Sequence, residues 1–291
     1  VAVVAVAVVA MPETPYNNLS TTGTTGIQIG GIKKKLNTGA WRPTLQETTF
    51  AISMLFQLTT LVLGVVALGK EAVPEVLRLV LVLEVVVQVV EFVWYTLVGL
   101  NYAFRQGSIS IAYRYLDWAI TTPVMLVSIF LFVRWDSNQE CTSIDKIFND
   151  GSHVAAIVSI VLADYLMLAI GAAYEIRFES VTRAMDRVAM CFSGLYLGFI
   201  PFLGAFAPLI VTVSANFSTW GFLSVALTFV TWAFYGAVAI LGENSTLSEE
   251  SRNSAYNLLD IVSKNVVGLV VSSVALGNEF LLSSNSTDCA I

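Results

Sequence analysis

Charged side chains are scarce in this chain of 291 residues. Only 12% of the residues are Asp, Glu, Lys or Arg, whereas 56% are hydrophobic. A soluble domain carries roughly 25% charged residues, and half of that charge cannot cover a surface exposed to water. The scarcity therefore argues against an ordinary soluble domain and favours an all-α membrane protein. The net charge of −6 also leaves no basic face for nucleic acid.

Cysteine and histidine are rare as well. The three cysteines, Cys141, Cys191 and Cys289, are too scattered for a disulfide framework or a metal site. The single histidine, His153, has no second histidine with which to bind a metal, and we expect it to have a structural role. The sequence therefore predicts no metal site.

The chain instead contains seven long apolar segments. A bilayer core about 30 Å thick needs about 20 apolar residues per helix. The segments lie at about 46–69, 74–101, 110–133, 153–175, 186–207, 219–241 and 254–277. Because the connections between them are short, we predict a single seven-transmembrane helix bundle over residues 46–280.

The two ends of the chain differ in composition from this bundle. We predict that residues 1–45 form an N-terminal extramembrane segment, which is polar beyond its first ten residues. Those ten, VAVVAVAVVA, contain two residue types and are too short to span a membrane, so we treat them as an artefact without function. Residues 281–291 are expected to form a short C-terminal tail.

Ionisable residues inside the apolar segments are informative, because a charge at mid-membrane costs about 2.5–3.5 kcal/mol and needs a partner. Lys264 lies ten residues into the last segment, and Asp260 lies four residues before it on the same helical face. Arg114 and Asp117 are three residues apart in the third segment. The spacing alone fits two interpretations. One is a set of structural ion pairs, and the other is a lysine that forms a Schiff base with an aldehyde and needs carboxylate counterions.

Two motifs on different segments carry a resemblance to a known family. The run RYLDWAITTP at residues 114–123 closely resembles the third helix of bacteriorhodopsin and its microbial relatives. The pattern Asp260-x-x-x-Lys264 is similar to the last-helix pattern of that family, in which the lysine carries retinal. The resemblance covers about residues 46–280. It implies a light-driven microbial rhodopsin, which is a membrane protein and not an enzyme.

The resemblance also implies roles for individual residues. It makes Lys264 the attachment point of all-trans retinal, joined covalently as a Schiff base, and Asp117 the primary counterion and proton acceptor. Asp260 matches the second counterion, and Arg114 matches the arginine on the extracellular side of the Schiff base. The residues that match retinal-binding positions are Tyr115, Trp118, Thr121, Thr122, Met167, Gly171, Trp232 and Tyr235. Tyr95 and Asp164 match polar positions near the counterion and the pocket.

The sequence departs from the family at the end of the pocket that holds the retinal ring. Ala239 stands where the family has a tryptophan, and Gly236 stands where it has a proline. Gly194 and Gly198 in the fifth segment are expected to give the ring room. The sequence therefore does not determine the shape of the pocket at the ring end.

A polar stripe on the second segment has no single interpretation. Glu84, Gln88, Glu91 and Tyr95 follow 4-3-4 spacing and share one helical face. In the third segment, Ser128 stands where an outward proton pump has a carboxylate that returns a proton to the Schiff base, and a serine has no proton to give near neutral pH. Glu91 or Glu84 could take over that role in a pump, line a hydrated cation path in a channel, or form a polar seam between helices.

We predict an outward proton pump first, a light-gated cation channel second and a photosensory receptor third. The set of Asp117, Thr121 and Ser128 with glutamates on the second segment also resembles rhodopsins of giant algal viruses, a group that contains both pumps and cation channels. The expected partners are the lipid bilayer and protons or small cations. The family resemblance further implies a trimer or pentamer with its N-terminus outside the cell, although the lysine and arginine distribution opposes the positive-inside rule for that topology.

Overall fold

The computed structural model describes residues 44–71, 73–105, 112–137, 143–178, 184–215, 218–243 and 246–277. The predicted N-terminal segment up to residue 43 and the predicted tail lie outside the described residues, as do several of the loops between helices. All structural statements below concern the described part of the chain.

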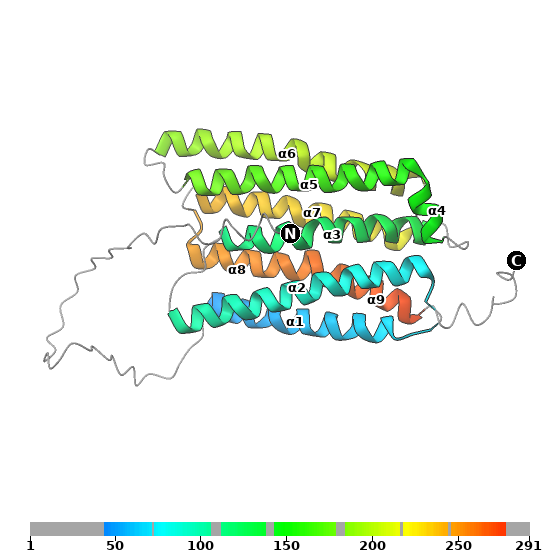
Figure 1. The fold of residues 1–291 in the computed structure, drawn as a ribbon. Coiled ribbons are helices and arrows are strands. Elements are labelled where there is room, and N and C mark those ends of the chain that lie inside the picture. Colours follow the sequence, from blue (N-terminus) through cyan, green and yellow to red (C-terminus); the bar gives the residue numbers. More distant parts are fainter. Residues whose placement is uncertain are drawn as a thin grey trace, which may run out of the picture. The chain divides into compact units, whose positions relative to one another are not determined.

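Seven long helices run alternately up and down a bundle (Figure 1). They are α1 (Leu45–Leu68), α2 (Glu75–Arg105), α3 (Ala112–Ser137), α5 (Gly151–Phe178), α6 (Ala184–Ala215), α7 (Thr219–Glu243) and a last helix built from α8 (Glu249–Asp260), the π-helical turn η1 (Ile261–Asn265) and α9 (Val266–Gly277). Within the described residues, six helices are long and apolar enough to cross a membrane, and α2 is the seventh long helix. No strand occurs in this part of the chain. The predicted all-α membrane bundle is confirmed.

Several helix ends differ from the prediction, among them the end of α6, which lies at Ala215 rather than at residue 207. A short helix, α4 (Ile144–Asn149), occupies a stretch whose composition predicts a loop, and the Ser143 side chain caps it by accepting a hydrogen bond from the Lys146 amide. The last helix begins at Glu249 rather than at residue 254, because Ser248 caps it in the same way by accepting from the Ser251 amide. The N-termini of α4 and α8 both depend on capping side chains, which a hydropathy pattern does not detect.

The last helix widens into a π-helical turn at residues 261–265, which includes Lys264. Such turns are rare and occur mostly as single turns inside α-helices, frequently at functional sites. The sequence pattern gives no sign of it. The irregularity therefore coincides with the lysine that the motif comparison singles out.

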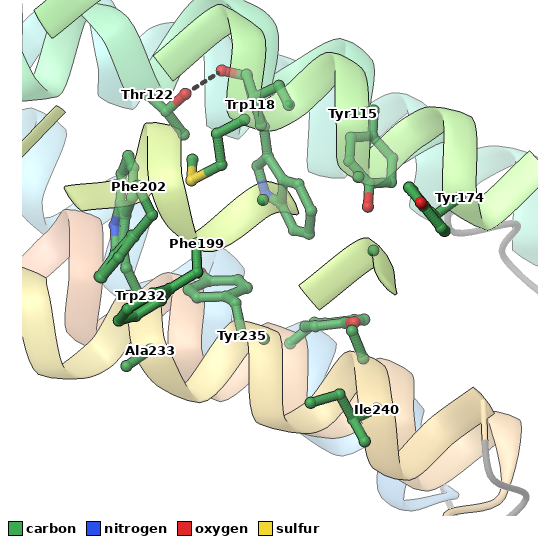
Figure 2. A pocket seen from close by; sticks show the side chains of 18 of the residues that line it. Tyr115, Trp118, Thr122, Tyr174, Phe199, Phe202, Trp232, Ala233, Tyr235 and Ile240 are labelled. Carbon is green, nitrogen blue, oxygen red and sulfur yellow. Dashed lines mark hydrogen bonds between the residues drawn. The ribbon is translucent and has the colours of Figure 1, made fainter. Parts of the chain in front are cut away.

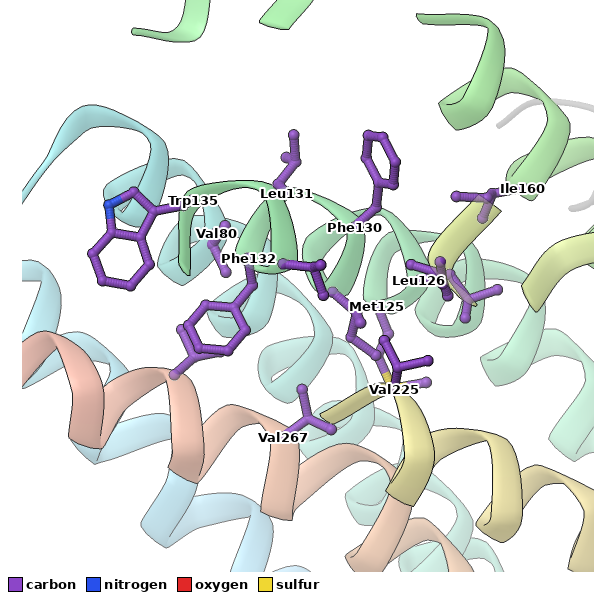
Figure 3. Close-up of a cluster of buried hydrophobic side chains, with 14 of the residues drawn as sticks. Val80, Met125, Leu126, Phe130, Leu131, Phe132, Trp135, Ile160, Val225 and Val267 are labelled. Carbon is purple, nitrogen blue, oxygen red and sulfur yellow. The ribbon is translucent and has the colours of Figure 1, made fainter. Parts of the chain in front are cut away.

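Apolar side chains close the end of the bundle formed by the C-terminal half of α3. The residues drawn in Figure 3 include Val80, Met125, Leu126, Phe130, Leu131, Phe132, Trp135, Ile160, Val225 and Val267, all of which are buried. They come from α2, α3, α5, α7 and α9, and together they fill the space between these helices.

The buried side of α1 is polar instead. Its buried residues are Gln46, Thr49, Ser53, Gln57, Thr60, Gly64 and Ala67, at helical spacings of three and four. Lipid gives a membrane helix no hydrophobic reason to bury apolar side chains, and small or polar residues allow close approach and hydrogen bonds between helices. α1 therefore presents a polar stripe to its neighbours, which are α2 and the last helix.

Candidate functional site

Lys264 is buried and contacts three carboxyl groups. Its Nζ lies 2.9 Å from Asp117 Oδ2 and 3.6 Å from Asp260 Oδ1, and it also contacts Glu91 Oε1. The side chain is 1% exposed, so its charge is shielded from water by these partners. The structure thus brings together the two motif positions and one residue of the second-helix stripe.

The carboxyl groups of Asp260 and Asp117 are held differently. Asp260 pairs with Arg114, whose Nη1 lies 3.0 Å from Oδ2, and it accepts hydrogen bonds from Tyr95 at 2.5 Å and Tyr235 at 2.6 Å. Charge-assisted contacts of this kind are strong and fix the geometry of an anion. In Asp117, Oδ1 has no hydrogen-bond partner among the described residues. Asp260 is therefore a fixed anion, whereas Asp117 has an oxygen free to accept a proton.

Asn257 connects this cluster to α1, and sequence reasoning missed it. Its Oδ1 accepts from Arg114 Nη2 at 2.6 Å, and its Nδ2 donates to Thr49 Oγ1 at 3.1 Å. Its carbonyl oxygen accepts from Ser53 at 2.8 Å. On the same side, Gln57 donates to Glu91 Oε2 at 3.4 Å. The helical spacing of polar residues in the first apolar segment was the available signal.

A cavity of about 500 Å³ lies on the other side of Lys264 (Figure 2). Of the predicted retinal-binding residues, those that line it are Tyr115, Trp118, Thr122, Met167, Gly171, Trp232, Tyr235 and Lys264. Thr121 is buried but does not line the cavity, and its hydroxyl donates to the Asp117 carbonyl oxygen at 3.0 Å. Gly194, Gly198, Gly236 and Ala239 lie in the lining, as the sequence suggests for the ring end.

The cavity wall is shaped by close packing. A Cβ at Gly171 would lie 2.8 Å from the Tyr115 hydroxyl oxygen, so glycine is needed there for Tyr115 to lie across α5. Trp118 packs edge-on against Tyr235, with ring centroids 5.3 Å apart. The Thr122 hydroxyl donates to Asp164 Oδ2 at 2.8 Å, which satisfies a polar group beside the cavity.

These residues fit a long apolar aldehyde such as retinal. The lining is mainly aromatic and aliphatic, and its volume falls within the range of about 300–1,000 Å³ typical of small-molecule sites. Lys264 supplies a buried primary amine at the cavity wall, and the carboxylates that a cationic nitrogen needs lie beside that amine. Trp118 and Trp232 would lie against the chain of the ligand.

Glu84 and Ser128 form a second polar contact, separate from the lysine cluster. The Ser128 hydroxyl donates to Glu84 Oε1, whereas Glu84 Oε2 has no hydrogen-bond partner among the described residues. Gln88 lies one helical turn along α2 and donates to the Lys264 carbonyl oxygen at 3.4 Å. The polar stripe of α2 therefore runs from the lysine cluster to the residue that stands in place of a pump's proton donor.

The helix bundle and the buried lysine beside an apolar cavity are the features of a retinal-binding membrane protein. The sequence profile of a family described as bacteriorhodopsin-like protein matches residues 44–277. The chain belongs to this family. Members bind retinal through a lysine Schiff base and are light-driven transporters rather than enzymes, so the chain is an integral, multi-pass membrane protein.

Solved structures agree with this assignment. Viral rhodopsin OLPVRII is 26% identical to this chain, with a TM-score of 0.63 over 80% of this chain and 99% of that one. Halorhodopsin, a light-driven chloride pump, is 18% identical, with a TM-score of 0.62 over 82% and 98% of the two chains. A light-driven proton pump from Leptosphaeria maculans is 16% identical, with a TM-score of 0.59 over 81% and 98%. The latter two identities support the fold alone. No curated protein gives a significant match.

Proposed function

We propose that this protein is a light-gated cation channel, with retinal joined to Lys264 and an ion path between α1, α2 and the last helix. The observation that carries the proposal is a set of buried polar side chains on these helices, which we call the polar seam. Its buried members include Ser53, Gln57, Thr60, Glu84, Gln88, Glu91, Asn257, Asn265 and Ser272. Polar residues between membrane helices also serve packing, and the feature that favours an ion path is that several of these buried side chains keep unpaired polar atoms.

Unpaired polar atoms along the seam support a hydrated path. Gln57 Oε1, Glu84 Oε2, Gln88 Oε1 and both side-chain polar atoms of Asn265 have no hydrogen-bond partner among the described residues. Each unpaired buried group costs about 1–3 kcal/mol, and buried polar groups of this kind are normally satisfied by ordered water. A chain of such waters would give a small cation oxygen ligands across the bilayer.

Apolar side chains close the path at the end of the bundle where the C-terminal half of α3 lies. Ala67 and Val80 belong to the same buried cluster, and they lie further toward that end of α1 and α2 than Thr60 and Glu84 do. Hydrophobic constrictions gate channels by excluding water. Opening therefore requires a displacement of α2 or α9, and α2 contacts Lys264 through Glu91 and Gln88.

The lysine cluster supplies the coupling to light. Retinal, when bound, supplies the absorption of visible light and a movement at Nζ. In the resting arrangement the proton on Nζ is held between Asp117 Oδ2 and Glu91 Oε1. Asp117 is the proton acceptor, because Asp260 is already fixed by Arg114 and two tyrosines. Loss of the Nζ proton weakens its attraction for Glu91, which frees α2 to move.

A photocurrent–voltage curve tests this function. In cells supplied with retinal, illumination should give a current that reverses sign near the equilibrium potential of a cation. A current of one sign at all voltages would instead support an outward proton pump.

The outward pump, which the sequence places first, is here the second candidate, and the contact between Glu84 and Ser128 favours it. This contact puts a carboxyl group beside the serine that replaces the usual donor. In a pump, Glu84→Gln should slow the return of the proton to Nζ and abolish sustained current. In a channel, it should change conductance while the photocycle still completes.

Orientation and assembly stay proposals. We propose that the α1 end that begins at Thr44 faces outside, and that the protein is a trimer or pentamer. Glycosylation at Asn18 or Asn244, each in an Asn-x-Ser/Thr motif, would support the orientation. Glycosylation at Asn285 would contradict it.

A further inference from the structure

The cavity beside Lys264 reaches the outer surface of the bundle between α6 and α7. Its lining includes Lys264 at 1% exposure and Trp232 at 8%, and also Phe199 at 49% and Tyr196 at 77%. Ala233 of α7 also lines the cavity and is exposed. A cavity lined by both fully buried and strongly exposed residues is open at the surface, and in a membrane that surface faces lipid.

Small residues determine where the opening lies. A Cβ at Gly198 of α6 would have Ile170 Cγ2, at 3.9 Å, as its neighbour within 4 Å, so the space beside this glycine is open. Across from it, α7 contributes Gly236 and Ala239, where the family pattern has larger residues. Figure 2 shows Phe199 and Ala233 beside Trp232, and Ile240 of α7 further along the cavity.

The neighbouring seam between α5 and α6 is filled at Gly194. A Cβ at Gly194 would lie 2.7 Å from the Tyr174 ring, so the ring already fills the space over that glycine. The exposed lining residues that mark the opening, Phe199 and Ala233, belong instead to α6 and α7.

We propose that this opening is the port through which the chromophore enters from the bilayer, and that Gly198, Phe199 and Ala239 set its width. The proposal rests on the proposed attachment of retinal to Lys264. Its ligand class is a long apolar polyene aldehyde, which partitions into lipid because its surface is almost wholly hydrocarbon. The apolar port is continuous with the cavity that contains the lysine amine.

The other routes to Lys264 are unfavourable for such a ligand. The α1–α2 side is lined by Gln57, Glu91 and Asn257, whose hydrogen bonds a hydrocarbon chain would break without replacing them. The α3 end is filled by packed side chains such as Phe130 and Phe132. Entry between α6 and α7 passes the apolar lining residues Phe199 and Ala233.

The test measures how fast the apoprotein in lipid vesicles gains visible absorbance after addition of all-trans retinal. Ala239→Trp fills the port and should slow this gain by about tenfold or more, equivalent to about 1.4 kcal/mol in the barrier. Phe199→Ala widens the port and should accelerate it. Ala237→Trp is the matched control, because Ala237 is an exposed residue of the same helix that does not line the cavity, and its rate should equal that of the wild type.

Each outcome decides the proposal. If the wild type, Ala239→Trp and Phe199→Ala gain absorbance at equal rates, the proposed port is wrong, although retinal still attaches. The port is also wrong if Ala237→Trp slows the gain as much as Ala239→Trp does. If Ala239→Trp binds no retinal at all, an accelerated Phe199→Ala supports the port and an unchanged one overturns it. A wild-type protein that gains no visible absorbance contradicts the attachment at Lys264 itself, which is a failure of the proposed function.

Discussion

On one side of Lys264, the interior consists of amides, hydroxyls and carboxyls such as Gln57, Glu91 and Asn257; on the other side, it consists of rings such as Trp118 and Trp232 around a cavity. The polar side leaves several buried atoms without protein partners, as expected of a region that holds water. The apolar side leaves a volume without protein atoms, as expected of a region that holds a hydrophobic ligand. The difference teaches that one lysine serves two compartments, because Lys264 lines the cavity while its Nζ contacts carboxyl groups on the polar side.

The lysine itself should give the largest effect. Lys264→Ala should abolish visible absorbance in the presence of retinal, because the apolar compartment would then have no amine for covalent attachment. The measurement is an absorption spectrum of the purified protein. Lys146→Ala, at an exposed lysine of α4, is the control and should keep its colour. A coloured Lys264→Ala protein would contradict the division into two compartments.

The counterion gives the next effect. Asp117→Asn should shift the absorbance maximum to the red, because the cationic nitrogen loses the carboxylate 2.9 Å away that stabilises its ground state. Asp164→Asn serves as the comparison, since Asp164 is bound to Thr122 rather than to the lysine, and it should shift the spectrum less. An unshifted Asp117→Asn spectrum would assign the counterion role to Asp260 or Glu91.

The polar side can be tested without disturbing the colour. Gln57→Leu removes the amide that reaches Glu91 and should lower the photocurrent several-fold, because a leucine at that position cannot solvate an ion. Thr228→Val is the matched control on the opposite side, where the hydroxyl is buried and bonded within α7. If both variants reduced the current equally, the seam would have no special part in conduction.

Glu91 tests the boundary between the two compartments. Glu91→Gln keeps the shape of the side chain but removes its charge from Lys264, so ion selectivity or the rate of proton return should change while retinal still binds. The readouts are the reversal potential and the decay of the photocycle. An unchanged reversal potential together with an unchanged photocycle would reduce Glu91 to packing between helices.

Much of the fold was predictable, because bilayer thickness fixes helix length and charge scarcity marks the spans. The joint motif on the third and last helices also identified Lys264, Asp117 and Asp260, and these residues meet in the structure. The π-helical turn at 261–265 was not predictable, since it depends on backbone packing rather than on composition. The contribution of α1 was missed, because Ser53 and Gln57 are single polar residues in an apolar segment, and they gain meaning only when α2 and α8 lie beside them.

The reversal potential of the photocurrent tests the central claim most directly. If the polar seam conducts cations, a tenfold rise in external sodium at constant pH should move the reversal potential to more positive voltage, by up to about 59 mV for a current carried by sodium alone. A current that keeps one sign at all voltages would contradict a cation path through the seam.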